Sequence, residues 1–329
     1  MSEIFSIAGE PIFDDRIKIE THTYNPYVNI TFGNSDEIQI FIQQNLYTLP
    51  CESFLCGEGR LKYEFLYTQD LYTLPCESFL YIKDRLESKK PSGAEGESST
   101  RLVNNCAAFM FEEIRYELDG MEIDRSRNVG ITSTIKNYAS LMDFAAKSHA
   151  IDDFNFCVPL SVLLGFCEDY KRVVINARHE LILIRARNDY NCLVSHESHE
   201  PKIVLLKIQW RMPLVVLNDI NKLALLRILD SERYLSVAFR SWDLYEFPLL
   251  QSMTKYSWAV KAATQLEKPR YVIFALQSGR KNVLPQDPSI FDNCKLTNVK
   301  LKFREANILI STRNEDGHAD LRRPPRFYC

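Results

Sequence analysis

Apolar and polar residues alternate with a period of two along several short stretches of the chain, and this feature limits the fold more than any other. From Leu206 to Met212, apolar residues occupy every second position and charged or amide residues lie between them. Successive side chains of a β-strand point to opposite faces of the sheet, so such a stretch has one apolar and one polar face. Asn298–Arg304 repeats the pattern, with Lys and Arg opposite Val, Leu and Phe. Both stretches therefore predict strands.

Further strands are predicted along both halves of the chain. Glu180–Arg185 is a continuous apolar run, which is typical of a strand covered on both faces. The strongest local signal is a hairpin from Tyr116 to Ile123, because Asp119-Gly120 suits a type I′ turn. The other predicted strands are Ile17–Thr21, Ile38–Ile42, Phe109–Glu117, Phe154–Val158, Leu235–Trp242, Ser257–Ala262 and Tyr271–Gln277.

Helical patterns are few and short. The two candidates are Asp219–Leu229, which follows Asn218 as a capping residue, and Ile131–Ala146. Strands and helices do not alternate regularly, which argues against a doubly wound or barrel α/β fold. Several short strands at roughly regular spacing favour a sandwich. The predicted fold class is all-β, with a few short helices in the connecting loops.

One sequence of ten residues occurs twice. LYTLPCESFL fills Leu46–Leu55 and again Leu71–Leu80. Two copies do not make a repeat architecture, which needs about three or more units to bury a continuous core. Each copy has a Pro after an extended run, so each can form a strand, but one position in a sheet holds only one of them. We therefore expect the surplus copy to be an inserted loop or an extra hairpin.

Two polar stretches interrupt the strand pattern. Lys89–Thr100 is rich in Gly, Ser and charge, which predicts a solvated surface loop. Asn188–Pro201 is polar, ends in Pro and falls between two strand-rich halves. We expect the domain boundary there, with a first domain of residues 1–192 and a second of residues 193–329.

Charge and glycine content argue against several classes of protein. The chain has 40 Lys and Arg against 43 Asp and Glu, so no overall charge attracts it to nucleic acid or to an anionic membrane. Glycine is scarce, at 11 of 329 residues, which leaves little material for the multi-glycine loops that bind phosphate. No apolar run reaches the length of about 18 residues that a membrane span needs, so we expect no membrane partner.

The N-terminal sequence and the cysteines bear on the compartment. Met1–Arg16 contains acidic residues and has neither a basic first segment nor an apolar run, unlike a secretory signal. The nine cysteines are an odd number, and without a signal they indicate reduced thiols. We therefore expect a cytoplasmic or nuclear protein that is not secreted.

Residues suited to metal or acid–base chemistry form no complete site in the sequence. Cys192, His196 and His199 have the types and spacing of zinc ligands, but a fourth ligand is not evident. A cupin-type metal centre needs a His-x-His pair, which does not occur, so His22 and His179 are predicted to be structural. We assign no catalytic, cofactor-binding or metal-binding residue, and we expect no cofactor and no enzymatic activity.

Three further signals are weak. Gly57-Glu58-Gly59 begins like a dinucleotide fingerprint, but Lys62 stands where the third Gly belongs. The basic segment Arg322–Tyr328 is short and follows acidic residues, so we expect no sequence-specific nucleic-acid partner. Trp242–Phe247 is rich in aromatic residues, which suit either a contact surface or a core.

Long stretches of the chain point to a family. They are THTYNPYVNITFGNSDEIQI, DLYTLPCESFLYI, GITSTIKNYAS, FCVPLSVLLGFCEDYKRVVINARHELILIR, KIQWRMP, FRSWDLYEFPLLQ and QLEKPRYVIFALQSGRKN. Together they closely resemble the double jelly-roll proteins encoded in arthropod genomes, which are similar to the major capsid proteins of Maverick or Polinton-type elements and adintoviruses. The resemblance runs from about Ile17 to Phe303 and implies two tandem antiparallel jelly rolls. It also implies a homotrimer, other capsid proteins as partners, and the virion as the location after assembly.

The chain departs from this family in three places. Family members have one copy of LYTLPCESFL, and the second copy resembles them better, so the insertion is expected over Cys51–Gln69 and part of the first copy. Leu141–Asp153 resembles the join left by a deletion, and the tail from about residue 304 does not resemble the family. A jelly roll needs about eight strands, and Lys202–Phe303 contains only four or five predicted ones. We therefore expect the second jelly roll to be incomplete.

These departures favour a capsid-like structural protein that is a degenerate, genome-integrated copy. One alternative is a host-adopted jelly-roll module that binds a protein or a glycan without assembling. The weaker alternative is a metal-dependent jelly-roll enzyme, against which the missing His-x-His pair argues.

Overall fold

The computed structural model describes the chain in blocks. Side chains and backbone are described for residues 18–27, 31–42, 71–87, 100–139, 153–196, 201–218, 220, 237–247, 257–258 and 272–294. Residue 140 and six further short strands are described by their backbone. Outside the described residues lie most of the predicted helix Asp219–Leu229, the loop Lys89–Thr100 except Thr100, most of Leu141–Asp153, and the basic segment Arg322–Tyr328.

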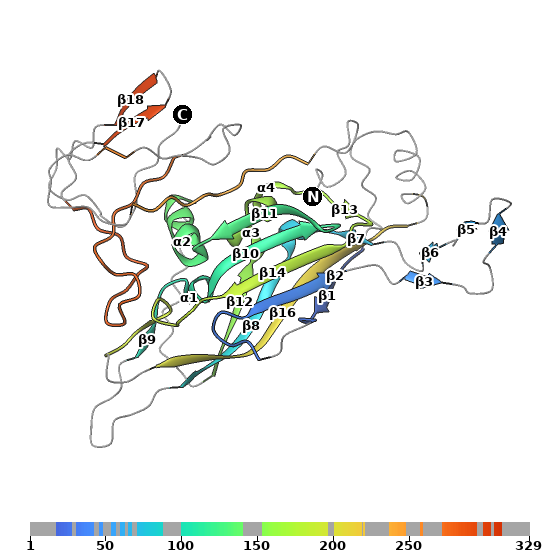
Figure 1. The fold of residues 1–329 in the computed structure, drawn as a ribbon, viewed down its shortest axis with the longest axis horizontal. Helices are drawn as coiled ribbons and strands as arrows, with labels where there is room; N and C mark the ends of the chain where they lie inside the picture. Colours follow the sequence, from blue (N-terminus) through green and yellow to red (C-terminus); the bar gives the residue numbers. More distant parts are fainter. Residues whose placement is uncertain are drawn as a thin grey trace.

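Two antiparallel sheets pack face to face and enclose the core (Figure 1). The first sheet has the order β12-β8-β16-β7-β13, and β1 also pairs with β16. The second has the order β11-β10-β14-β2. The strands of the first sheet are β1 (Lys18–Tyr24), β7 (Tyr72–Thr73), β8 (Phe79–Glu87), β12 (Asp153–Pro159), β13 (Val174–Ile175) and β16 (Lys202–Val216). Those of the second are β2 (Glu37–Ile42), β10 (Phe111–Leu118), β11 (Met121–Arg127) and β14 (His179–Arg185).

Short helices close the ends of the sandwich, and the all-β fold class with a few short helices is confirmed. They are η2 (Pro75–Glu77), α1 (Cys106–Phe109), α2 (Val129–Ser140), α3 (Leu160–Leu163) and α4 (Gly165–Asp169). The helix α2 confirms the first part of the helix predicted over Ile131–Ala146. Among the described residues, no helix is long and apolar enough to cross a membrane.

The local predictions for the sandwich strands are confirmed. The turn between β10 and β11 has φ of 51° at Asp119 and 78° at Gly120, as a type I′ turn requires. Leu181 and Leu183 of β14 are fully buried and Ile182 is 4% exposed, so this strand is covered on both faces. Both edges of β14 are also paired, because it lies between β10 and β2 in the interior of its sheet.

The strand β16 crosses the boundary expected near residue 192. Its residues 202–211 pair with β8, and its residues 210–216 pair with β1. A strand hydrogen-bonded on both sides cannot belong to a separate domain, because its removal would leave two sheet edges unpaired. The first sandwich therefore continues to Val216, beyond the expected limit of residues 1–192.

The polar stretch Asn188–Pro201 is also part of the sandwich where the structure describes it. Cys192 and Leu193 are fully buried, and β15 (Leu193–Val194) pairs with β9 (Arg101–Leu102). The carboxylate of Asp189 accepts hydrogen bonds from Arg185 Nη2 at 2.6 Å and from the backbone N–H of Ile203 at 3.0 Å. The described part of this stretch therefore does not interrupt the sandwich at the expected boundary, because its polar groups are satisfied inside the protein.

The two copies of LYTLPCESFL have different structures. The second copy forms β7, η2 and the start of β8, within the six-stranded sheet. The first copy contributes β3 (Leu46–Thr48) and part of β4 (Phe54–Cys56). Among the described strands, β3 pairs with β6 (Phe65–Tyr67) and β4 pairs with β5 (Arg60–Lys62), and both partners lie between the two copies in the sequence (Figure 1). Of the two predicted forms of the surplus copy, an inserted loop or an extra hairpin, the structure has hairpin pairing.

Two strands predicted after β16 are absent from the described residues. Positions 237–242 of the predicted strand Leu235–Trp242 are irregular, and positions 272–277 of Tyr271–Gln277 contain only a single bridge, Leu276 to Asp292. Asn298–Arg304 does form a strand, β17 (Val299–Phe303), which pairs with β18 (Ala306–Ile310). Most of Ser257–Ala262 lies outside the described residues, and the incomplete second jelly roll stays a prediction.

Candidate functional site

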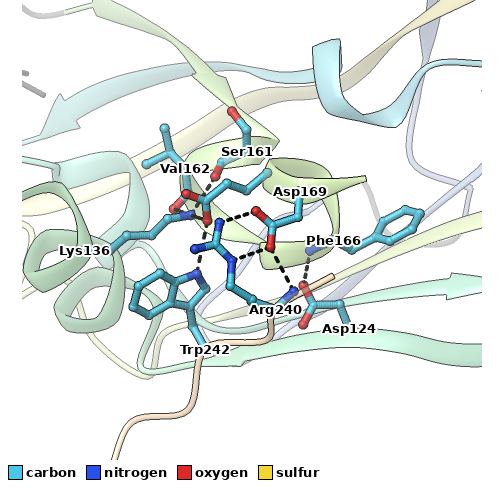
Figure 2. Close-up of polar contacts among 9 residues, drawn as sticks. Asp124, Lys136, Ser161, Val162, Phe166, Asp169, Arg240 and Trp242 are labelled. Atoms are coloured by element: carbon cyan, nitrogen blue, oxygen red, sulfur yellow. Dashed lines mark hydrogen bonds and ion pairs between the residues drawn. The ribbon is translucent and has the colours of Figure 1, made fainter. Parts of the chain in front are cut away.

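The chain that follows the sandwich returns to it at the helices α2, α3 and α4. Residues 237–247 lie against α4, where the carboxylate of Asp169 binds Arg240 (Figure 2). The adjacent carboxylate of Glu168 binds Trp242. We call this contact the α4 anchor. It joins parts of the sequence about 70 positions apart through charged groups.

Arg240 makes the strongest part of the α4 anchor. Its backbone N–H and its Nε donate to Oδ2 of Asp169 at 3.0 and 2.6 Å, and its Nη2 donates to Oδ1. The guanidinium therefore binds the carboxylate with two parallel hydrogen bonds, a geometry that fixes orientation as well as distance. The hydrogen bonds from Arg240 lower the pKa of the Asp169 carboxyl, so this group is ionised at neutral pH.

Glu168 connects a second pair of residues to the same helix. Its Oε2 accepts a hydrogen bond from Trp242 Nε1 at 3.1 Å and pairs with Lys136 Nζ at 2.9 Å. Lys136 Nζ also donates to the carbonyl of Ser161 at 2.7 Å and lies 5.6 Å from the centroid of the Trp242 ring. Its side chain is only 6% exposed, so this ammonium group is satisfied inside the protein.

Gly165, the first residue of α4, allows the close approach of residues 237–247. A Cβ atom at this position would lie 1.7 Å from the carbonyl oxygen of Arg240, so no other residue fits without a shift of the backbone. Beside it, Phe166 packs edge-on against Phe239 with ring centroids 5.4 Å apart. The buried carboxylate of Asp124 accepts the backbone N–H of Phe166 at 2.9 Å, and burial raises its pKa.

A second segment of the later chain, residues 272–294, contacts α2 and the β9–β15 pair. Lys281 Nζ binds the carboxylate of Glu246 at 2.9 Å, which links this segment to the first one. The backbone N–H of Ser195 donates to the carbonyl of Leu284 at 3.1 Å, and Asp287 pairs with Arg101 at 3.2 Å. The described parts of both segments are thus held against the sandwich.

The histidines at positions 22 and 179, which were considered as metal ligands, have different surroundings in the structure. His179 is fully buried and contacts the hydroxyl groups of Tyr116 at 2.7 Å and Thr73 at 2.8 Å, and burial lowers its pKa to about 3. His22 is exposed on β1 beside Glu20. His179 is therefore the satisfied core histidine that the sequence predicted.

Cys192, which was considered as a zinc ligand, is a core residue. The side chain of Cys192 contacts that of Cys106, and the two thiols pack in the core. His199, Cys51 and Gly57–Gly59 lie outside the described residues. In the blocks that the structure describes, no group of three potential metal ligands comes together.

The sequence revealed only part of the α4 anchor. It identified Trp242 as part of an aromatic stretch that suits a contact surface or a core. In the structure the indole of Trp242 packs on Lys136, whereas Tyr245 and Phe247 are 41% and 43% exposed. It missed Lys136, Glu168, Asp169 and Arg240. Single charged residues are common throughout the sequence and do not indicate a site. The adjacent carboxylates Glu168 and Asp169 were the one local feature that could have indicated this contact. The anchor can hold chain segments together, and its charged groups are already paired with one another.

These features define a two-sheet antiparallel sandwich with a later chain segment docked on it, and a family comparison agrees with this class. The model of the double jelly roll-like domain matches residues 100–309. The chain belongs to this family. No curated protein matches it.

Solved structures of viral capsid proteins are similar to this chain at low sequence identity. The PBCV-1 virus capsid in a quasi-atomic model matches at 12% identity with a TM-score of 0.38, covering 63% of this chain and 44% of that one. PBCV-1 VP54, fitted into a reconstruction of the virophage Sputnik, matches at 12% identity with a TM-score of 0.37, covering 65% of this chain and 46% of that one. The Faustovirus major capsid protein matches at 8% identity with a TM-score of 0.37, covering 64% of this chain and 56% of that one. The chain spans about half the length of these proteins.

Proposed function

We propose that the protein is a capsid-like structural subunit that acts by self-association and not by catalysis. One observation carries the proposal: the family match extends to residue 309, well past the end of the sandwich at Val216. The matched region thus includes residues 237–247, which dock on α4, and all but the last residue of the β17–β18 hairpin, and both follow the first sandwich in the sequence. A subunit of this type binds its neighbours through complementary lateral surfaces in closed, symmetric contacts.

The finer assignments rest on the sequence resemblance. We infer an endogenous, degenerate copy from an arthropod genome, related to Maverick or Polinton-type elements and adintoviruses, with an incomplete second jelly roll. Its expected partners are two further copies of itself in a homotrimer and other capsid proteins. Its expected location is the cytoplasm or nucleus, or the virion if it assembles. An adjacent exon that encodes the missing strands would contradict the degenerate copy.

Size-exclusion chromatography with light scattering, followed by negative-stain microscopy, tests the proposed assembly on the full chain. Trimers or shells are the expected result. A well-folded monomer at all concentrations would overturn the proposal. That result would favour a module that binds another protein, for which the exposed rings of Tyr245, Phe247 and Trp258 offer aromatic contact surface.

A further inference from the structure

The outer face of the six-stranded sheet carries an excess of positive charge. Leu80, Ile82 and Asp84 of β8 are buried, so the residues that alternate with them point away from the core. The residues of β16 and β12 that pair with these outward positions of β8 also point away from the core. Two carboxylates, Glu87 and Asp153, lie among five cations. We call the five the basic face: Lys83, Arg85, Lys202, Lys207 and Arg211.

Two lysines of the basic face lie directly opposite each other. Lys83 and Lys207 are partners in the pairing of β8 with β16. Like charges at such positions destabilise a sheet. Asp153 lies 3.9 Å from Lys83 Nζ but already binds Arg85 at 2.7 Å, and no carboxylate of a described residue lies within 4 Å of Lys207. The basic face therefore has the charge of an anion-binding surface.

The outer face of the four-stranded sheet provides an internal comparison. Each of its described arginines has a carboxylate within salt-bridge distance, so that face is neutralised by its own residues. The pairs are Arg115 with Glu37 and Glu113, Arg125 with Glu122, Arg127 with Glu113, and Arg178 with Glu180. On the basic face, by contrast, Lys202, Lys207 and Arg211 have no carboxylate of a described residue within salt-bridge distance, while Lys83 and Arg85 share Asp153. The excess of positive charge is therefore a property of that face and not of the whole sandwich.

Arg211 adds a flat surface to the basic face. Its guanidinium lies 4.8 Å from the ring centroid of Tyr81 and 5.7 Å from that of Phe79. Its Nε is buried without a hydrogen bond to any described residue. The two rings hold the guanidinium plane in place, and such a plane can stack with a nucleobase.

We propose that the basic face binds single-stranded nucleic acid without reading its base sequence. Phosphates neutralise the opposed lysines Lys83 and Lys207, and a base stacks on the guanidinium of Arg211. Charge combined with stacking is the mode by which proteins bind single strands of any sequence. An acidic protein surface would match the lysines but would make no use of the fixed guanidinium plane, so the nucleic acid is the better match.

Fluorescence anisotropy of the full chain with a labelled thymidine oligonucleotide of about 20 residues tests this proposal. We expect binding at about 50 mM salt that weakens steeply as salt rises, and similar affinity for a mixed sequence. The double variant Lys83→Gln/Lys207→Gln should weaken binding about tenfold. It should also reduce the slope of log affinity against log salt by about 1.4, since each single-strand phosphate contributes about 0.7.

Two further variants separate charge, stacking and general effects. Arg211→Lys keeps the charge and loses the plane, so binding should weaken several-fold with the salt slope unchanged. Arg125→Gln/Arg127→Gln removes two cations from the other sheet and should leave binding unchanged. Because Lys83 and Lys207 repel each other, their double variant should melt no lower than the wild type.

Four results would overturn the proposal. They are no binding by the wild type at low salt, an equal loss in the Arg125/Arg127 control, full affinity in Arg211→Lys, and displacement of the oligonucleotide by polyglutamate as readily as by unlabelled oligonucleotide. The last would identify an acidic protein surface as the partner. None of these readouts depends on assembly, so they are independent of the proposed capsid-like function.

Discussion

Asp84 is a buried carboxyl group without a hydrogen-bond partner among the described residues. It lies on β8 with no exposed surface, and neither of its side-chain oxygens is bonded. The nearby charge of Arg185 is already paired with Asp189. Burial raises the pKa of Asp84 to about 8, with Arg185 opposing the shift, so the folded protein holds this carboxyl in its protonated form near neutral pH.

We predict that Asp84→Asn stabilises the protein at high pH. Between about pH 4 and pH 8 the folded state keeps a proton that the unfolded state releases, so the free energy of unfolding falls as pH rises through this range. Asn has no proton to lose, and the variant should gain on the order of 5 kcal/mol at pH 8 and little at pH 4, because each unit of pKa difference is worth about 1.4 kcal/mol. Urea denaturation at several pH values measures the difference.

Asp169→Asn is the matched control and should behave in the opposite way. Because Arg240 lowers the pKa of Asp169, its contribution to stability is present above the ordinary pKa of 3.8 and is lost as pH falls through the lowered value. This variant should therefore lose stability at neutral pH and differ little from the wild type in acid. Equal pH profiles for the two variants would contradict both assignments.

At the scale of elements, we predict that Gly165→Ala releases residues 237–247 from α4. The added Cβ would overlap the carbonyl of Arg240, so the segment must move away, at a cost of about 1–3 kcal/mol. Trypsin should then cleave after Arg240 faster than in the wild type.

Gly279→Ala is a control in the other docked segment. Gly279 has a positive φ of 57° but no atom within 4 Å of the Cβ position, so Ala there strains the backbone without a clash. Cleavage after Arg240 should be unchanged. Equal acceleration in both variants would show a general loss of stability instead of a local release.

The sequence predicted strands better than it predicted their partners. A period of two identifies β16 as a strand, but nothing in Leu206–Met212 states that its neighbours are β8 and β1. Leu235–Trp242 has the same kind of pattern. Its described positions are irregular because the carboxylate of Asp169 binds the backbone N–H of Arg240 in place of a neighbouring strand, while Gly165 lets the backbone approach closely. The α4 anchor was missed for this reason: it depends on contacts between distant positions.

For the whole molecule, we predict that the duplicated segment can be deleted. Removal of residues 46–70 eliminates β3–β6, which pair only with each other, and keeps the copy that lies in the six-stranded sheet. The chain that lacks residues 46–70 should unfold at a temperature close to that of the full chain, as measured by circular dichroism. Removal of residues 71–80 takes away β7 and the start of β8 and should abolish cooperative unfolding. Similar behaviour of the two deletions would contradict this assignment.

A further prediction concerns the expected boundary. A chain that stops at residue 192 lacks β16 and leaves β8 and β1 without their shared neighbour. It should be insoluble or lack a cooperative thermal transition, whereas a chain of residues 1–294 should have one. A cooperative transition in the shorter chain would restore the boundary near residue 192.

The position of β16 also affects how the protein is made. Its partners β1 and β8 leave the ribosome long before it, since Val216 pairs with Lys18. At about 5–20 residues per second, the strands wait roughly ten seconds or more for the one that joins them. During this interval their hydrogen-bonding edges are open to other chains. Slow synthesis or a pause before residue 202 should therefore favour aggregation, and co-expressed chaperones should increase the soluble yield.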